Sequence, residues 1–318
     1  MTRHTLLRFA SLIIFTLAGT ALAYAQPQRT FVSAQNGNDA NTVNNCSVTQ
    51  PCRNFNAAIG VVAAGGEVVA LDSGGYGSTT ISKAVTLTGP TGVYVAITAL
   101  TAGTSAILVS ASSTDTVVLR GLTLTGLGGN DGINVTSVGN LHIEGCVISG
   151  FTNVGIYVDL SADGSHIFVK DTIVRNNGNA GVYITTSTGT VRASIDNCRS
   201  QRNGSYGFGA VSNSMVTINR SVASGNANAG FYAVSFDPGA PTELSCEECV
   251  SSNNISGFHV QVLTGGVATI RVSHSTATHH TGYGFIQDGG VFESLGNNFV
   301  RGNAFGATSG TIAVVTAQ

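Results

Sequence analysis

The sequence predicts an all-β protein that winds as a parallel β-helix, with three short strands in each coil. The first observation is composition: of 318 residues, 41 are Gly, 42% are hydrophobic and only 9% are charged. A disordered chain would carry more charge, and a long helical chain would not tolerate so much Gly. The second observation is a glycine that recurs every 22 to 27 residues, and the third is the alternation of apolar and polar residues between these glycines.

Residues 1–25 have the features of a secretory signal peptide. Arg3 and Arg8 precede an apolar run that ends in small residues, and we expect cleavage after Ala23 or Ala25. No second apolar stretch of membrane-spanning length follows, so we expect a secreted or periplasmic protein without a transmembrane segment. With 14 Lys and Arg against 16 Asp and Glu, the chain has no basic cluster to neutralise phosphates, which argues against nucleic acid as a partner.

An internal repeat organises the rest of the chain. The aligned glycines are Gly132, Gly155, Gly181, Gly207, Gly230, Gly257, Gly284 and Gly306. A second column of mostly small residues falls eight or nine positions earlier in most repeats, at Cys146, Thr172, Cys198, Ser221, Cys249, Ser275 and Asn297. Each repeat therefore contains one strand before the second column, one after it and one that begins at the glycine. Three strands in so short a repeat, with no helix between them, are typical of a parallel β-helix.

Asparagine stands four residues before the glycine in four successive repeats, at Asn177, Asn203, Asn226 and Asn253, and His280 takes the same place in the next repeat. Asn tolerates a left-handed backbone, and stacked amides can hydrogen-bond from coil to coil. We therefore predict a structural asparagine ladder along this turn.

These repeats resemble the right-handed parallel β-helix proteins of the pectate-lyase-like superfamily, and the likeness covers nearly all of the mature chain. The segments 29–33, 36–39, 51–59 and 65–71 look like that family's capping strand, disulfide loop, capping helix and first coil. The resemblance implies an N-terminal cap over 26–66 and a single-stranded right-handed solenoid over 67–318, with coils of about 22 to 28 residues. Members include lyases, hydrolases, epimerases and adhesins, so the resemblance gives the fold and not the activity.

The six cysteines fall into three pairs, Cys46 with Cys52, Cys146 with Cys198, and Cys246 with Cys249. The first pair closes a short loop in a segment with little core of its own, so we predict a disulfide there. The second pair stands two coils apart, about 9.6 Å at the usual strand spacing, which is too far for a bridge. The third pair has the spacing of a metal or redox motif, but both residues fall in inward columns. Core filling or an incidental disulfide is therefore favoured, and no metal site is expected.

The outward column of the first strand reads Arg120, Glu144, Lys170, Asp196, Asn219, Glu247, Ser273 and Leu295. Alternating charges on adjacent strands are typical of a ladder that stabilises stacking and keeps the face soluble. The resemblance implies an alternative, because in related lyases the cleft lies over this strand and a Lys or Arg acts as the base. Lys170 or Arg120 would then be the base, and Glu144 and Asp196 would be its carboxylate partners. No clear acidic cluster for Ca²⁺ accompanies them.

The outward column of the third strand reads Asn134, Tyr157, Tyr183, Gly209, Tyr232, His259 and Ile286. Exposed aromatic rings on a flat sheet are platforms for the apolar faces of sugars, and Asp159 and Gln261 on the same side can bind sugar hydroxyls. The alternative is that Tyr is simply a good strand residue and shields its own sheet.

We therefore expect a secreted β-helix protein that contacts extracellular or cell-envelope polysaccharide. Short inter-coil loops favour a non-catalytic binding or adhesion scaffold. A polysaccharide lyase or hydrolase acting on an acidic glycan is the alternative. No cofactor is expected, apart from Ca²⁺ if the protein is a lyase, and the sequence leaves the sugar and the oligomeric state open.

Overall fold

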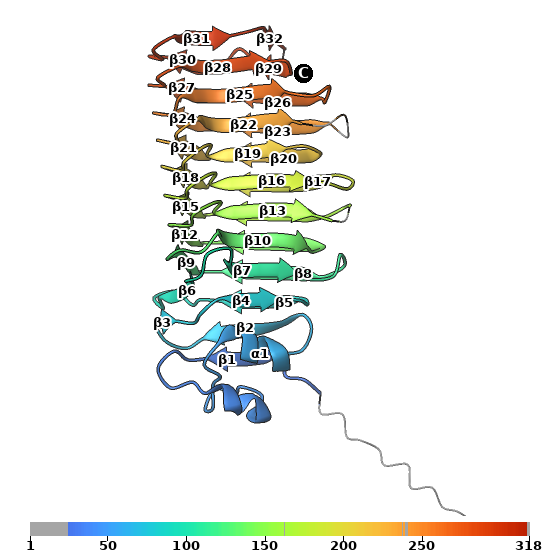
Figure 1. The fold of residues 1–318 in the computed structure, drawn as a ribbon, viewed down its shortest axis with the longest axis vertical. Coiled ribbons are helices and arrows are strands. Elements are labelled where there is room, and N and C mark those ends of the chain that lie inside the picture. Colours follow the sequence, from blue (N-terminus) through green and yellow to red (C-terminus); the bar gives the residue numbers. More distant parts are fainter. Residues whose placement is uncertain (1–24, 162, 237, 239–240, 317–318) are drawn as a thin grey trace, which may run out of the picture.

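The computed structural model describes residues 25–161, 163–236, 238 and 241–316. They form a solenoid of stacked coils whose C-terminal end lies opposite the N-terminal helix and strands (Figure 1). Strands of successive coils pair in parallel and build three sheets of 12, 10 and 10 strands, which confirms the predicted fold class. The predicted signal peptide falls, apart from Ala25, outside the described residues. In the part of the chain that the structure describes, no helix has the length and apolarity needed to cross a membrane.

Each full coil contributes one strand to each sheet, and sheet 1 has two further strands, one at each end. Sheet 1 contains β1 (Arg29–Val32), β2 (Gly66–Ala70), β5 (Val85–Thr88), β8 (Thr116–Arg120), β11 (Asn140–Glu144), β14 (His166–Lys170), β17 (Val191–Asp196), β20 (Ser214–Asn219), β23 (Thr242–Glu247), β26 (Ala268–Ser273), β29 (Val291–Ser294) and β32 (Ile312–Val314). Sheet 2 contains β3 (Gly74–Gly75), β6 (Val95–Ala99), β9 (Thr123–Gly126), β12 (Val147–Ser149), β15 (Ile173–Arg175), β18 (Arg199–Gln201), β21 (Val222–Ser224), β24 (Val250–Ser252), β27 (Thr276–Thr278) and β30 (Phe299–Arg301). Sheet 3 contains β4 (Thr79–Ile81), β7 (Ser105–Ser110), β10 (Asp131–Ser137), β13 (Ile156–Leu160), β16 (Val182–Thr186), β19 (Phe208–Val211), β22 (Ala229–Ser235), β25 (Ser256–Val262), β28 (Tyr283–Asp288) and β31 (Gly306–Ser309).

The N-terminal segment packs a short helix against the first strands. A 3₁₀ helix (Asp39–Asn44) precedes α1 (Phe55–Val61), which contacts β1, β2 and β4. Cys46 and Cys52 form the predicted disulfide, with their Cα atoms 4.9 Å apart. The division into a cap over 26–66 and a solenoid from residue 67 stays a prediction.

The interior is filled by the inward-facing residues of all three sheets. On sheet 3 the rings of Phe208, Phe231 and Phe258 lie one above another, with centroids 5.3 and 4.7 Å apart and ring planes within 13° and 7° of parallel. All three are buried. Burial of each such ring stabilises the fold by roughly 1.5 to 3 kcal/mol.

The turn between sheets 2 and 3 contains the asparagine ladder, with one correction. Asn177 Nδ2 donates to Asn203 Oδ1 at 3.0 Å, and Asn203 Nδ2 donates to Asn226 Oδ1 at 2.9 Å. The next member is Asn254, whose Oδ1 accepts from Asn226 Nδ2 at 3.1 Å. The prediction of Asn253 was wrong, because this turn is one residue shorter than its neighbours and counting back from the glycine overshoots.

Asn253 instead belongs to the column that precedes the ladder, where the backbone is left-handed. The φ angles of this column lie between 53° and 72° at Asn176, Arg202, Gly225, Asn253, His279 and Gly302. The left-handed residue and the ladder residue are therefore neighbours and not the same residue. His280 holds its ladder position, since its Nδ1 accepts from the backbone N–H of Asn254 at 3.2 Å.

The last coil is also shifted by one residue. Tyr283 pairs with Gly306, so Ala307 and not Gly306 lies in the glycine column. Likewise the backbone N–H of Ser275 bonds to Asn298 Oδ1 at 2.8 Å, which places Asn298 and not Asn297 in the small-residue column.

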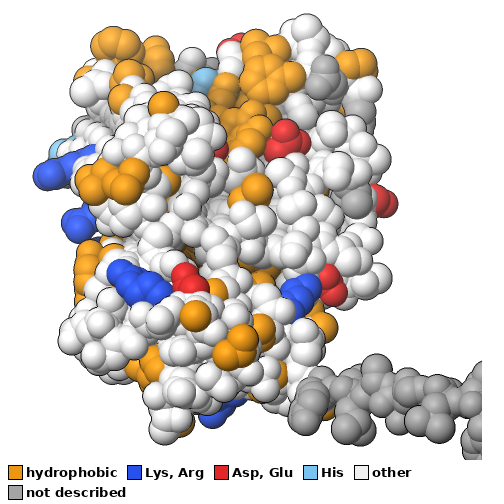
Figure 2. All heavy atoms as spheres, turned by 60° about the horizontal axis from the view of Figure 1, so that its bottom comes forward, with side chains coloured by type: hydrophobic (Ala, Val, Ile, Leu, Met, Phe, Trp, Pro, Cys, Tyr) orange, Lys and Arg blue, Asp and Glu red, His pale blue; other side chains and the backbone are white. Residues whose placement is uncertain are grey.

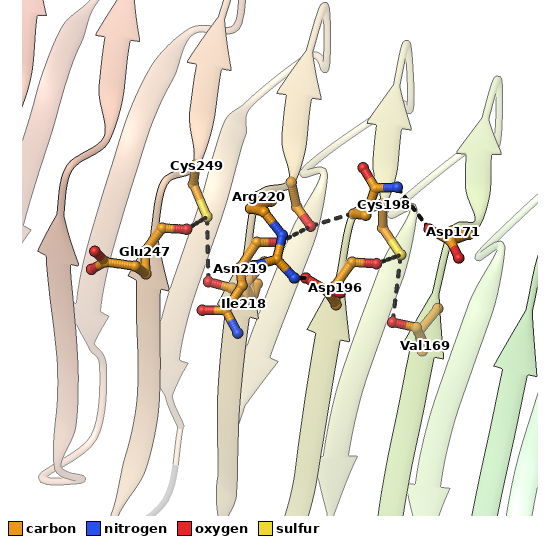
Figure 3. A network of polar contacts seen from close by, with 11 residues as sticks. Val169, Asp171, Asp196, Cys198, Ile218, Asn219, Arg220, Glu247 and Cys249 are labelled. Atoms are coloured by element: carbon orange, nitrogen blue, oxygen red, sulfur yellow. Dashed lines mark hydrogen bonds and ion pairs between the residues drawn. The ribbon is translucent and has the colours of Figure 1, made fainter.

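The four remaining cysteines are free thiols inside the solenoid. Figure 3 shows Cys198 Sγ facing the backbone oxygens of Val169 and Asp196, at 3.6 and 3.2 Å, and Cys249 in the equivalent place two coils on. Burial raises the pKa of Cys146 to about 11 and that of Cys198 to about 12, so both stay protonated and unreactive. Burial and the neighbouring Cys249 likewise raise the pKa of Cys246.

Candidate functional site

Aromatic residues run up the outward face of sheet 3. The strand register pairs Tyr157 with Tyr183, Tyr183 with Gly209, Gly209 with Tyr232, and Tyr232 with His259. The predicted column is therefore continuous in space over five coils, with Gly209 as its single position without a side chain.

The gap at Gly209 is filled by Tyr206, a residue that the sequence analysis missed. Tyr206 comes from the turn before β19 and its ring lies over Gly209, where a Cβ would approach ring carbon Cε2 within 2.5 Å. Its centroid is 6.1 Å from that of Tyr183 and 5.1 Å from that of Tyr232. We call the resulting series of five rings the aromatic stack: Tyr157, Tyr183, Tyr206, Tyr232 and His259.

The aromatic stack is partly buried, which corrects the expectation of freely exposed rings. Tyr206 exposes 9% of its surface, and the other four rings are half-buried. The tyrosines pack on a small apolar cluster formed by Val154, Ala180 and Ala229. This packing fixes the rings in place and still leaves part of each outer ring open to solvent.

Polar groups border the aromatic stack on the side where the third strands end. Tyr157 Oη donates to Asp159 Oδ2 at 3.2 Å, Tyr232 Oη donates to Gln261 Oε1, and Gln261 Nε2 donates to Asp288 Oδ2 at 2.7 Å. Burial, together with the charge of Asp159, raises the pKa of Tyr157 to about 12. Burial likewise raises the pKa of Tyr232 to about 12, so the hydroxyls of Tyr157 and Tyr232 stay protonated at neutral pH and can accept a hydrogen bond from a ligand.

His259 ends the stack with an unused nitrogen. Its Nε2 is buried and has no hydrogen-bond partner among the described residues. Burial lowers the pKa of His259, so its ring is neutral at pH 7. An unsatisfied buried polar atom is destabilising, and such atoms in native structures often serve a ligand or a bound water.

The charged column of sheet 1 also lies in the predicted register, but its acids are occupied. Arg120 Nε lies 2.8 Å from Glu144 Oε2, and Arg220 lies 2.5 Å from Asp196 Oδ1 (Figure 3). Glu247 pairs with His274 at 2.7 Å. Arg220 and His274 come from the turn after the strand and not from the column itself. Three of the four predicted catalytic residues, Arg120, Glu144 and Asp196, are thus held in surface ion pairs.

Lys170 differs from its neighbours in this column. It lies between Glu144 and Asp196 in the register, yet within the described residues no ion pair is formed by its Nζ. No three His, Cys, Asp or Glu side chains of the described ranges gather as a metal site, and the paired carboxylates do not fit a calcium ion. Figure 2 shows few charged side chains over the face in view, as the low charge content predicts.

A hollow of about 270 Å³ lies further along sheet 1, over β20, β23, β26 and β29. Its polar walls include Asn219, Glu247 and Arg271. Arg271 bridges Glu243 and Glu293 at 2.7 and 2.8 Å, so its positive charge offsets one of the two carboxylates that it contacts. The hollow does not include Lys170 or the other residues predicted to be catalytic.

The stacked coils of three parallel strands place the chain in the class of parallel β-helix proteins. Comparisons with known proteins agree with this assignment. The chain belongs to the family described as right handed beta helix region, whose model matches residues 78–245 and 131–305. A solved structure, the crystal structure of pectate lyase Pel9A, is similar with a TM-score of 0.58 and 16% identity, over 93% of this chain and 79% of that one. That likeness shows the fold. No curated protein sequence matches the chain.

Proposed function

We propose that this protein binds an extracellular polysaccharide through the aromatic stack and does not cleave it. The observation that carries the proposal is the series of five rings with centroids 5.1 to 6.1 Å apart. At the usual strand spacing it extends over about 19 Å, which suits several sugar units of a linear chain. The apolar faces of sugars stack on the rings, while Asp159, Gln261 and Asp288 bind hydroxyls.

Several features support an extracellular polysaccharide as the ligand. The sequence begins with the features of a signal peptide, and the Cys46–Cys52 disulfide is consistent with an extracellular protein. The structurally similar Pel9A is a pectate lyase. The ion pairs of Glu144 and Asp196 favour binding over catalysis, because these carboxylates already have cationic partners.

A glycan array with one variant and one control tests the proposal. Tyr183→Ala removes a central ring, and we expect at least about tenfold weaker binding to the glycan that the wild type selects, or ~1.4 kcal/mol. Tyr94→Ala is the control, because Tyr94 is 56% exposed and lies outside the stack. Circular dichroism checks that both variants are folded. Equal binding by the two variants would show that the stack is not the binding face.

The second candidate is a lyase or hydrolase acting on an acidic glycan. Lys170 favours it, because this exposed side chain lies between two acids and has no ion-pair partner within the described residues; Lys170 or Arg120 would be the base near the C5 proton of a uronate. Product formation is followed by the ultraviolet absorbance of unsaturated uronates. Lys170→Ala and Asp196→Asn should abolish the product if this function is correct, and a wild type that yields neither unsaturated nor reducing ends rules it out.

A further inference from the structure

Sheet 2 differs from the other two sheets in the sign of its charges. Its strands contain three charged residues, Arg175, Arg199 and Arg301, and no Asp, Glu or Lys, although the whole chain has a net charge of −2. The turn after β18 adds Arg202. In the described ranges none of these four guanidinium groups lies within ion-pair distance of a carboxylate, whereas sheet 1 pairs Arg120, Arg220 and Arg271 with acids.

Two of the unpaired arginines line a groove of about 540 Å³. The groove is lined by Arg175, Asn176, Gln201, Arg202, Ser224 and Asn253, which come from four successive coils. At the usual spacing of strands it therefore runs for about 14 Å along the solenoid axis. Such a shape suits an extended chain better than a compact small molecule.

The backbone at Arg202, which lines this groove, adopts the left-handed conformation that residues with a side chain rarely adopt. Arg202 has φ of 53°, in a column where Asn and Gly, which accept this conformation, occupy most positions. Gly225 follows it on the next coil, and a Cβ there would lie 3.4 Å from Arg202 Cγ. A Cβ at that distance would be in ordinary van der Waals contact, so Gly225 adds an open stretch of backbone to the groove lining without being required by Arg202. Arg220 has a similar φ of 47°, but its guanidinium is used in an ion pair with Asp196.

Neutral groups complete the lining. Gln201 Nε2 donates to Ser224 Oγ at 3.3 Å, and both residues are partly exposed between the two arginines and Asn253. Amide and hydroxyl groups beside guanidinium groups suit a ligand that carries both hydroxyls and negative charge. The residues that line the groove include no aromatic side chain on which a nucleic-acid base could stack. Its two arginines would also hold a nucleic acid only weakly, because they neutralise few phosphates.

We infer that this groove binds the oxyanion groups of an acidic polysaccharide. The planar guanidinium groups of Arg175 and Arg202 suit the bidentate recognition of carboxylate or sulfate oxygens. The groove lies on sheet 2, separate from both the aromatic stack and the charged column of sheet 1. The inference goes beyond the proposed function and does not depend on it.

The test compares two double variants that remove the same charge. Arg175→Ala/Arg202→Ala empties the groove of guanidinium groups, and Arg29→Ala/Arg192→Ala removes two arginines from sheet 1. The probes are polygalacturonate, heparin, neutral dextran and single-stranded DNA, measured by calorimetry at two salt concentrations. We expect the wild type to bind polygalacturonate or heparin in a salt-sensitive manner. The groove variant should lose at least about tenfold in affinity and the control less than about twofold.

Each further outcome has one reading. Binding of heparin alone or polygalacturonate alone supports the site and identifies sulfate or carboxylate as the group bound. Three outcomes would overturn the proposed site. They are equal losses of affinity in the two double variants, a wild type that binds neither acidic polysaccharide, and binding of single-stranded DNA as tight as that of the acidic polysaccharides. Tyr183→Ala should leave binding of the acidic probe intact, so failure at the aromatic stack and failure at this groove are distinguishable.

Discussion

Sheet 3 carries one aromatic column on each of its faces, and the two columns are built differently. Inside, Phe208, Phe231 and Phe258 are fully buried and nearly parallel. Outside, the tyrosine rings are tilted by 29° to 51°, partly exposed and bordered by acids and amides. Phe231 and Tyr232 are thus adjacent in the sequence but lie on opposite faces of the sheet, one buried and one partly exposed. The inner column maximises packing, whereas the outer column gives up part of its packing for an accessible surface.

The largest expected effect is a difference in the free energy of unfolding between the alanine variants of Phe231 and Tyr232. Phe231→Ala should lower the free energy of unfolding by about 3 to 5 kcal/mol, because it leaves a cavity between two stacked rings. Tyr232→Ala should cost roughly 1 to 2 kcal/mol, because its ring is only half-buried. Urea denaturation measures both values, and equal losses would erase the distinction between the columns.

A second prediction concerns the polar part of the interior. Asn203→Ala should cost about 1 to 3 kcal/mol, since the backbone N–H and Nδ2 of Asn177 lose their acceptor. Asn254→Ala should behave in the same way. Asn253→Gly, which keeps the left-handed backbone, should leave the melting temperature nearly unchanged. A loss at Asn253 and none at Asn254 would restore the uncorrected register.

The ladder should also make stability depend on pH through His280. Burial lowers the pKa of His280 to about 4, below the unfolded value near 6.5. A group with a depressed folded pKa stabilises fully above its unfolded pKa, and this contribution is lost as the pH falls toward 4. Between pH 7 and pH 4 we expect a loss of about 1 to 3 kcal/mol from this residue. His280→Asn keeps a hydrogen-bond acceptor in the ladder but cannot be protonated in this pH range. Urea denaturation at pH 7 and pH 4 should therefore show a smaller loss of stability for this variant than for the wild type. An equal loss in both proteins would contradict the role given to His280.

The smallest effect is expected for the buried thiols. Alkylation of the native protein at pH 8 should leave Cys146 and Cys198 unlabelled, because their raised pKa values keep them protonated and the coils cover them. Unfolding without reductant should expose four reactive thiols and retain the Cys46–Cys52 bridge. Mass spectrometry reads out both results. A bridge between Cys146 and Cys198 would be incompatible with the coil register.

Much of the fold followed from the sequence because a solenoid repeats its local rules. The alternation in a strand such as 166–170 and the glycine that opens the third strand are both visible within one repeat. The predicted column positions were wrong where a turn is one residue longer or shorter than the same turn in the other coils. Asn253 and Asn254 are chemically identical neighbours, and only the hydrogen bond from Asn226 tells which one faces inward.

The candidate site was less predictable, because side chains from turns complete it. Tyr206 lies outside the strand pattern, and its place depends on the space above Gly209. A glycine inside an aromatic column, with a tyrosine three residues earlier in the same repeat, was the available signal. The ion pair between Asp196 and Arg220 was hidden for the same reason, since Arg220 lies in the turn after β20.

Because the coils stack one on another, the length of the aromatic stack is set by the number of coils that contribute a ring. Each coil contacts mainly the coils before and after it, so stability accumulates step by step along the axis. A tandem duplication of residues 184–209, a unit of 26 residues, would copy Tyr206 together with the Gly209 that its ring covers. The solenoid would grow by one coil, about 4.8 Å, and every column would stay in register. Under the proposed function, such a duplication would lengthen the binding face by one ring.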